Sequence, residues 1–172
     1  MFLNKLRSGV LENHPEPAIK RFTIPLGESA NGISTKNHPI ILVPETFTSK
    51  GCEMPVLNSR YQSREHSFVY VNGSLSLHEF CNKVSKVSMQ DKSIISWKGS
   101  DTLFPGEPVF ISKPGESEED EGVLVSAVTN SDHGGQSILI FLCAKTLKEL
   151  GRASFDSPIP CAMHGIFLPD VV

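Results

Sequence analysis

The sequence predicts an all-β protein. Short runs of β-branched and aromatic residues recur along its 172 residues, and polar or glycine-rich turns separate them. The chain also contains 13 glycines and 12 prolines, which tend to end regular structure, and it shows no long segment of helical periodicity. These observations indicate a sheet-and-turn architecture, and the order strand, hairpin, strand, turn, strand is also that of one propeller blade.

The N-terminal third alternates between polar lead-ins and short strands. Residues 1–17 carry few apolar side chains and two prolines, so we expect a lead-in segment. Residues 18–26 alternate in polarity and predict a strand, and the polar stretch 27–39 predicts a loop. The apolar residues 40–43 predict a short buried strand, and residues 47–67 are expected to be irregular.

The middle of the chain predicts further strands and one hairpin. Residues 68–73 are rich in aromatic and β-branched side chains and end at a glycine, which indicates a strand followed by a turn. Residues 83–89 and 93–97 read as two strands joined by the polar turn 90–92. A further strand is predicted at residues 109–111.

Two strands near the C-terminus stand out because they are almost continuously apolar. Residues 122–128 and 137–142 are therefore predicted to be buried on both faces. Residues 144–151 are compatible with one or two helical turns that end at Gly151, and residues 152–155 resume as a strand.

Charge and hydropathy exclude some classes of function. The net charge is -3 and there is no basic stripe interleaved with aromatic residues, so we expect no nucleic-acid partner. The longest apolar run, 138–144, is far shorter than the about 20 residues that a membrane helix needs. Residues 114–121 include five acidic side chains, which predict a solvated loop rather than a metal site.

The cysteines and the N-terminal residues bear on the compartment. Cys52, Cys81, Cys143 and Cys161 are widely spaced, with no Cys-x-x-Cys pair, so neither a zinc site nor a disulfide framework is expected. The first residues lack the apolar region of a secretory signal, and we find no targeting signal. Reduced thiols in an intracellular protein, cytoplasmic or mitochondrial, are the expectation.

His164 is the first candidate for chemistry. It lies between Pro160 and Pro169 and next to Gly165, so the backbone around it is restricted and a close approach is allowed. A neutral imidazole held in one direction is the commonest transition-metal ligand. The competing interpretation is a histidine that merely satisfies a turn or a core, and the spacing alone favours that one.

Two glutamates are set apart from the charged surface. Glu107 lies between Gly106 and Pro108, and Glu53 precedes Met54 and Pro55. Each is a single acid at an apolar strand or turn. It is either a carboxylate that caps backbone groups at a strand end, or one that accepts the free N–H of a metal-bound imidazole.

Several segments together resemble the C-terminal part of the animal carotenoid cleavage oxygenases, the family of the β-carotene oxygenases and the retinoid isomerohydrolase. They occur in the order of the family and cover most of the chain after residue 17. Among them are Phe104-Pro105-Gly106-Glu107-Pro108 and His164-Gly165-Ile166-Phe167. The full set comprises residues 20–26, 53–58, 104–110, 119–126, 141–153 and 164–167.

The resemblance implies an incomplete portion, the last blades, of a seven-bladed β-propeller with Fe(II) on its axis. In the family, four histidines hold the iron and glutamates back three of them. His164 matches the last histidine ligand, and Glu53 and Glu107 match two of the three glutamates. We expect Glu107 to accept a hydrogen bond from the ring N–H of His164 and so to fix its tautomer.

The implied reaction is oxidative cleavage of a polyene double bond by O₂, with a carotenoid or apocarotenoid as substrate. The ending around residues 160–169 looks closest to the eccentric-cleaving 9′,10′-oxygenases. Two positions depart from the family: Cys143 replaces a usual aspartate, and residues 161–163 replace bulkier side chains.

The family's other three histidine ligands and its membrane-contacting segments would lie upstream of residues 1–172. The chain is therefore expected to be a C-terminal portion of such an oxygenase that holds no iron tightly alone. The alternative is a non-catalytic, β-rich module that binds a lipid or a partner chain.

Overall fold

The computed structural model describes residues 17–24, 41–48, 51–73, 82–115, 117–132, 136–157, 159–160 and 162–169. These residues form three antiparallel sheets, and the only helical element among them is one short 3₁₀ turn, η2 (Ser59–Tyr61). No helix in the described part has the length and apolar character needed to cross a bilayer. The described residues are therefore all-β in class, as predicted.

The N-terminal sheet contains four strands in the order β3-β4-β5-β6. Their bounds are β3 (Glu53–Val56), β4 (Phe68–Gly73), β5 (Lys83–Ser88) and β6 (Ile94–Lys98). The predicted hairpin is confirmed, because Val84 pairs with Trp97 and Val87 with Ile94. The predicted strand 68–73 pairs with both β3 and β5.

Strand β3 corrects the prediction that residues 47–67 are irregular. It lies at the edge of the N-terminal sheet and contains Pro55, which lacks the N–H that a central strand would need. Its pairing with β4 shifts register between Glu53 and Val56, so the proline sits where the ladder is interrupted. A proline that reads as a breaker in the sequence is thus accommodated at an irregular edge.

The C-terminal sheet contains five strands, four of them in the order β11-β10-β9-β7, while β8 also pairs with β9. Their bounds are β7 (Leu103–Pro105), β8 (Val109–Ser112), β9 (Gly122–Asn130), β10 (Ser137–Cys143) and β11 (Glu149–Phe155). Strand β7 pairs with the end of β9 and β8 with its beginning. The two short strands therefore form one line that is interrupted at residues 106–108.

Burial in β9 differs from the prediction of a strand buried on both faces. Buried and half-buried residues alternate along it, with Leu124, Ser126 and Val128 on the buried side. This alternation is the ordinary pattern of an antiparallel strand that packs one face against a core. An apolar run in sequence did not distinguish the two cases.

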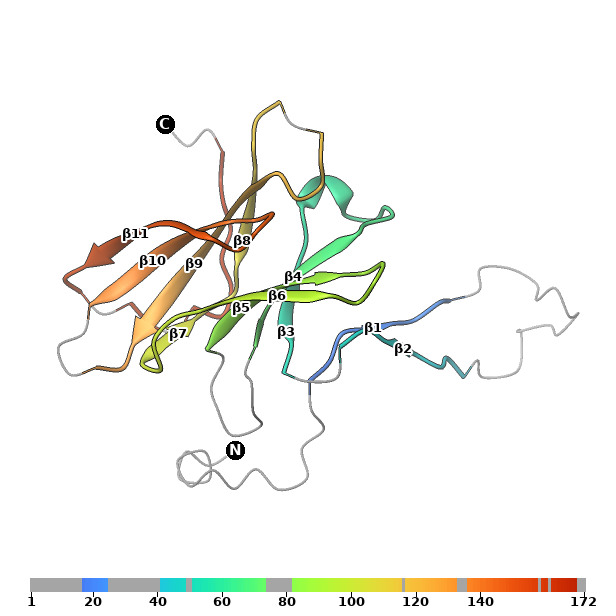
Figure 1. The fold of residues 1–172 in the computed structure, drawn as a ribbon, viewed down its shortest axis with the longest axis horizontal. Coiled ribbons are helices and arrows are strands. Elements are labelled where there is room, and N and C mark those ends of the chain that lie inside the picture. The colour runs from blue at the N-terminus through green and yellow to red at the C-terminus, as the bar shows by residue number, and fades with distance from the viewer. Residues whose placement is uncertain are drawn as a thin grey trace, which may run out of the picture.

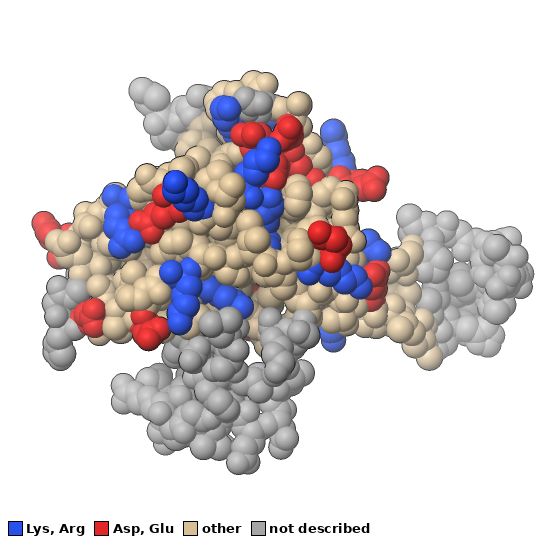
Figure 2. All heavy atoms as spheres, viewed as in Figure 1, with Lys and Arg blue, Asp and Glu red and all other residues tan. Residues whose placement is uncertain are grey.

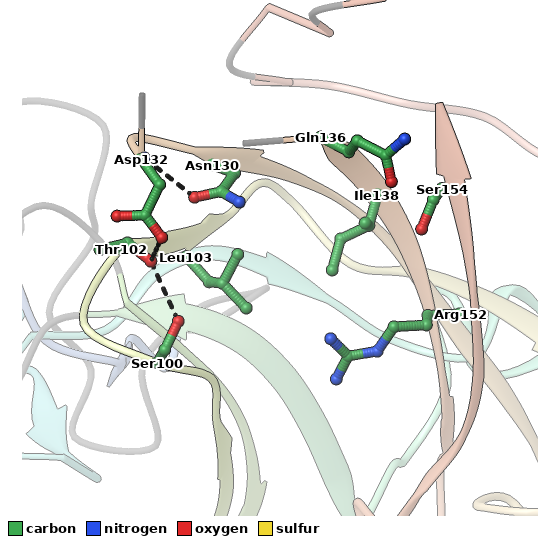
Figure 3. A pocket seen from close by; sticks show the side chains of 9 residues that line it. All are labelled: Ser100, Thr102, Leu103, Asn130, Asp132, Gln136, Ile138, Arg152 and Ser154. Carbon is green, nitrogen blue, oxygen red and sulfur yellow. Dashed lines mark hydrogen bonds between the residues drawn. The ribbon is translucent and has the colours of Figure 1, made fainter. Parts of the chain in front are cut away.

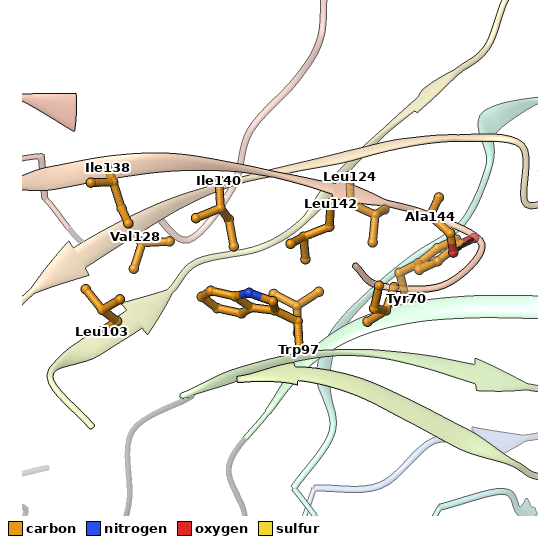
Figure 4. Close-up of a cluster of buried hydrophobic side chains, with 11 residues drawn as sticks. Tyr70, Trp97, Leu103, Leu124, Val128, Ile138, Ile140, Leu142 and Ala144 are labelled. Atoms are coloured by element: carbon orange, nitrogen blue, oxygen red, sulfur yellow. Dashed lines mark hydrogen bonds between the residues drawn. The ribbon is translucent and has the colours of Figure 1, made fainter. Parts of the chain in front are cut away.

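A hydrophobic core joins the two large sheets (Figures 1 and 4). Tyr70 and Trp97 of the N-terminal sheet face Ile140 and Leu142 of the C-terminal sheet, and Val84 belongs to the same cluster. Each fully buried side chain of this kind contributes about 1.5–3 kcal/mol to folding. The other face of the N-terminal sheet carries a smaller cluster of Cys52, Val69, Val71 and Val87.

The acidic run also binds the two sheets together, which corrects the prediction that it is a solvated loop. Asp120 is buried and its carboxylate lies 2.6 Å from the Nζ of Lys86 in β5. Glu119 accepts hydrogen bonds from the backbone N–H groups of Ser67 and Phe68. Glu118 does lie at the surface, where it pairs with Lys145. Basic and acidic groups are intermixed on the face that Figure 2 shows.

Two predictions in the N-terminal part need correction. Of the predicted strand 18–26 the structure describes residues 18–24, and among these only β1 (Lys20–Arg21) is strand, paired with β2 (Glu45–Thr46). Ile41 and Val43 are 87% and 84% exposed and belong to no strand, because apolar composition does not itself supply a partner surface. The lead-in 1–17 lies, except for its last residue, outside the described residues, as does the loop 27–39.

The predicted helical turns at 144–151 are replaced by a tight connection. The N–H of Leu147 donates to the carbonyl of Cys143 at 2.8 Å, which closes a single turn. Leu147 has a φ of 57°, in the left-handed region, and the chain then enters β11 at Glu149. The turn does not propagate because its last residue leaves helical geometry.

Candidate functional site

The candidate site begins at the interruption between β7 and β8. Pro105 ends β7 and Pro108 is the last residue of the interruption, and neither proline can donate to a ladder. The N–H of Gly106 donates to the carbonyl of Ala127 at 2.8 Å, and the hydroxyl of Ser126 donates to the carbonyl of Gly106 at 2.9 Å. Glu107 therefore projects from a turn that β9 holds from behind.

The C-terminal segment returns to this turn after β11 (Figure 1). The N–H of Glu107 donates to the carbonyl of Ala162 at 3.2 Å. That carbonyl lies where a Cβ on Gly106 would have to be, so only glycine permits this approach. A Cβ on Gly165 would come within 3.2 Å of the Val109 side chain, which places this glycine close to β8 as well.

Glu107 and His164 are brought together by this contact. The Nδ1 of His164 lies 3.3 Å from the Oε2 of Glu107, and the N–H of Gly165 donates to the same oxygen at 3.3 Å. The Glu107 side chain is 15% exposed, whereas that of His164 is 78% exposed. If Nδ1 carries the proton that Glu107 accepts, the Nε2 lone pair is left available on an accessible ring.

Glu53 is placed differently. It begins β3, where its backbone pairs with Asn72 of β4, and it is exposed. Within the described residues its side chain makes no hydrogen bond or ion pair. Asn72 is buried and its Nδ2 lies 3.5 Å from the carbonyl of Pro105, so β4 approaches the turn that carries Glu107. The structure does not bring Glu53 into contact with His164.

The described residues contain no group of three or more His, Cys, Asp or Glu side chains that could hold a metal ion. His66 is half-buried and its Nδ1 lies 3.1 Å from the carbonyl of Arg64. The other four histidines, His14, His38, His78 and His133, lie outside the described part. The metal roles predicted for His164, Glu107 and Glu53 stay predictions.

The surroundings of His164 are apolar. Met163, Ile166, Phe167 and Leu168 are all exposed, and Ile166 reaches 79%. Exposed apolar side chains next to a histidine offer an apolar ligand or partner a surface to contact. Sequence reasoning did not identify Ser126 as a support of the site, although a single serine in the apolar run 122–128 is a usable signal.

A hollow of about 320 Å³ lies elsewhere (Figure 3). Its lining is mostly polar and comes from the ends of β7 and β9, from β10 and from β11. Leu103 and Ile138 contribute apolar surface, and Arg152 and Asp132 contribute charge. Neither Glu107 nor His164 lines it, so this hollow is separate from the candidate site.

Comparison with known families gives one consistent result. Residues 2–169 match the model of the family described as retinal pigment epithelial membrane protein (RPE65). A Gallus gallus protein named beta,beta-carotene 15,15'-dioxygenase is 32% identical over 168 residues, 89% of this chain and 31% of that protein. A Neurospora crassa protein named carotenoid dioxygenase is 34% identical over 134 residues, 78% of this chain and 21% of that protein.

Solved structures agree with the fold. A chimera of the proteins abbreviated ACO and RPE65 gives a TM-score of 0.67 at 25% identity, and it covers 72% of this chain and 26% of its own. The cobalt-substituted Synechocystis ACO gives a TM-score of 0.68 at 23% identity, over 73% of this chain and 27% of its own. These likenesses and the two stacked sheets support the predicted incomplete β-propeller.

The chain spans about a third or less of the length of these relatives. The predicted resemblance to the carotenoid cleavage oxygenases is confirmed at the level of the family. The closer likeness to the 9′,10′-cleaving enzymes stays a prediction.

Proposed function

Because the chain belongs to the retinal pigment epithelial membrane protein (RPE65) family, we propose that it forms the C-terminal portion of an Fe(II)-dependent carotenoid dioxygenase. The substrate class is a carotenoid or apocarotenoid, and the co-substrate is O₂. Relatives from an animal and a fungus, both named as dioxygenases of carotenoids, support this proposal. One polyene double bond and one O₂ would yield two carbonyl groups, so the atoms balance without a further reductant.

The observation that carries the proposal is the contact between Glu107 and His164. A carboxylate that accepts the Nδ1–H of an imidazole raises the basicity of the ring and orients its Nε2 toward a metal. Here the two atoms are 3.3 Å apart and the ring is accessible. His164 therefore fits the role of one metal ligand, and Glu107 fits the role of the group that fixes its tautomer.

Iron, when bound, would supply the redox chemistry for the reaction of O₂ with the polyene. The residues of this chain would do three other things. His164 would bind the metal through Nε2, Glu107 would hold its Nδ1 proton, and the apolar side chains of Ile166 and Phe167 would keep water away from the reacting bond.

We expect the chain on its own to hold iron weakly and to be inactive. A single imidazole does not make a tight iron site, and the described residues offer no cluster of three or more candidate ligands. Anaerobic loading with Fe(II), followed by elemental analysis, tests this. We expect the iron content per chain to be no greater than that of the His164→Ala variant. One tightly held iron per chain would contradict the expectation of weak binding.

A second candidate function is a non-catalytic module that binds a lipid or a partner chain. The exposed apolar side chains of Met163, Ile166 and Leu168 favour it, because accessible apolar groups gathered on one segment mark interaction surfaces. This function requires neither iron nor His164.

A graft separates the two functions. We would replace the matching segment of the Gallus gallus relative by this chain and measure cleavage of β-carotene by chromatography of the products. Cleavage that is abolished by His164→Ala and kept by His66→Ala, a half-buried histidine distant in sequence, supports the oxygenase. Cleavage that survives His164→Ala contradicts it.

A further inference from the structure

We propose that Ser126 is a positioning residue that aims Glu107 at His164. Ser126 lies in β9, is buried, and donates its hydroxyl hydrogen to the carbonyl of Gly106 at 2.9 Å. It touches neither His164 nor the Glu107 carboxylate in any described contact, so its action would pass through the backbone. That this orientation of Glu107 matters for iron binding rests on the proposed function. The orientation itself does not depend on that function.

The peptide unit that joins Gly106 to Glu107 is hydrogen-bonded at both ends. The carbonyl of Gly106 and the N–H of Glu107 belong to the same planar group. The hydroxyl of Ser126 donates to the oxygen of that group, and the N–H of Glu107 donates to the carbonyl of Ala162 at 3.2 Å. Because both ends of the plane are held, its rotation is restricted, and the direction in which Glu107 leaves the backbone is set with it.

The preceding peptide unit is held too. The N–H of Gly106 donates to the carbonyl of Ala127 at 2.8 Å, so β9 binds this glycine on both sides. These bonds replace the regular ladder that β7 and β8 make with β9 on either side of the interruption. Ser126 is the side-chain member of this set and therefore the one that a substitution can remove.

The row of residues around Ser126 shows that a hydroxyl is unusual at this position. Leu124 and Val128, two residues away on either side, are apolar and fully buried in the core (Figure 4). A hydroxyl on this face is unfavourable unless it makes a hydrogen bond. The bond to Gly106 meets that requirement at the place where the chain needs a fixed turn.

The test reads the tautomer of His164 in the full 172-residue chain without metal. Histidine labelled with ¹⁵N gives different nitrogen shifts for the Nδ1–H and Nε2–H forms, and the His164→Gln variant assigns the signal. The spectra are recorded at about pH 8.5, roughly two units above the ordinary pKa of a histidine side chain. We expect His164 in the parent chain to be mainly the Nδ1–H form, because Glu107 accepts that proton.

The Ser126→Ala variant should shift the ratio of tautomers toward Nε2–H, the form that free imidazole side chains favour in water, by about tenfold. The matched control is Ser85→Ala, which removes a partly buried hydrogen bond of 2.8 Å between the buried Ser85 and Ser96 in the N-terminal sheet. The control should leave the ratio unchanged.

Three results would overturn the proposal. They are a parent chain in which His164 is mainly Nε2–H, a Ser126→Ala variant with the parent ratio, and equal shifts in Ser126→Ala and Ser85→Ala. Loss of iron binding in the graft described above would count against the proposed function and leave this inference intact, because the tautomer is read without metal.

Discussion

The two large sheets each open with an irregular segment that carries a glutamate near a proline, but only one of the two glutamates meets a histidine. Glu107, at the interruption between β7 and β8, is largely buried and contacts His164. Glu53, at the start of β3, is exposed, and its carboxylate has no hydrogen-bonding partner in the described residues. The same local pattern thus gives a complete carboxylate–imidazole pair in the C-terminal sheet and a carboxylate alone in the N-terminal sheet.

The difference between Glu107 and Glu53 shows that each carboxylate is positioned by its own sheet. Whether a histidine meets the carboxylate depends on a second segment of chain that packs against that sheet. For Glu107 that segment is the C-terminal one, which packs on Gly106 through the carbonyl of Ala162. For Glu53, no histidine among the described residues makes a hydrogen bond or ion pair with its carboxylate.

The largest effect is expected where the two sheets are joined. Lys86→Met leaves Asp120 buried without its cation, and breaking such a pair costs about 3–5 kcal/mol of the free energy of unfolding. Urea denaturation measures it. Lys145→Met, which removes an exposed pair with Glu118, should change little. Similar losses in both variants would mean that the buried pair does not join the sheets as described.

Gly106→Ala tests the packing of the C-terminal segment on its turn. The new Cβ would collide with the carbonyl of Ala162, and we expect a loss of about 1–3 kcal/mol in unfolding free energy. The contact of His164 with Glu107 should weaken at the same time. Gly151→Ala in the same sheet is the control, since nothing lies within 4 Å of its added Cβ. A harmless Gly106→Ala would refute the close approach.

The two glutamates can be compared directly. In the graft onto the Gallus gallus relative, Glu107→Gln and Glu53→Gln should each lower iron affinity by about 10–100-fold, the usual cost of losing a carboxylate behind a metal ligand. In the chain alone, only Glu107→Gln should alter the tautomer of His164, because only Glu107 touches it. An equal effect of Glu53→Gln there would remove the contrast between the sheets.

The smallest effect concerns Glu149, which links the sheets by accepting from Trp97 and from Arg152. The hydrogen bond from Arg152 holds the pKa of Glu149 below its ordinary value of 4.5, and the bond from Trp97 acts in the same direction. Its contribution to stability is therefore complete above about pH 4.5 and is lost as the pH falls through the lowered pKa.

We expect this loss to stay below about 1 kcal/mol, since the Arg152 side chain is half exposed and screened by water. The urea midpoint, followed by the fluorescence of the single Trp97, measures it at pH 6 and pH 3. Glu149→Gln should show a smaller difference between the two pH values. A difference as large as that of the parent chain would show that other carboxyl groups cause it.

Strands with strong local signals were predictable from sequence. Residues 68–73 and 137–142 are strands as expected, because β-branched and aromatic content specifies them locally. Strand β3 was not predictable, since a segment containing Pro55 becomes a strand only through pairing with β4. The burial of Asp120 depends on Lys86, 34 residues earlier in the chain, and a charge run does not reveal such a partner.

The candidate site was predictable only through the family. Glu107 and His164 are 57 residues apart, and no spacing rule joins them. The resemblance paired them, and the structure shows the contact. The support from Ser126 came from neither source, because it depends on the register of β9 against an interrupted strand.

The most direct test of the central claim is the iron content of the grafted protein, measured per chain after anaerobic loading with Fe(II). The account predicts about one iron per chain in the parent graft and in His66→Ala, and a loss of at least about tenfold in affinity in His164→Ala. Full iron content in His164→Ala, with the fold intact, would show that His164 is not a ligand and would contradict the proposed function.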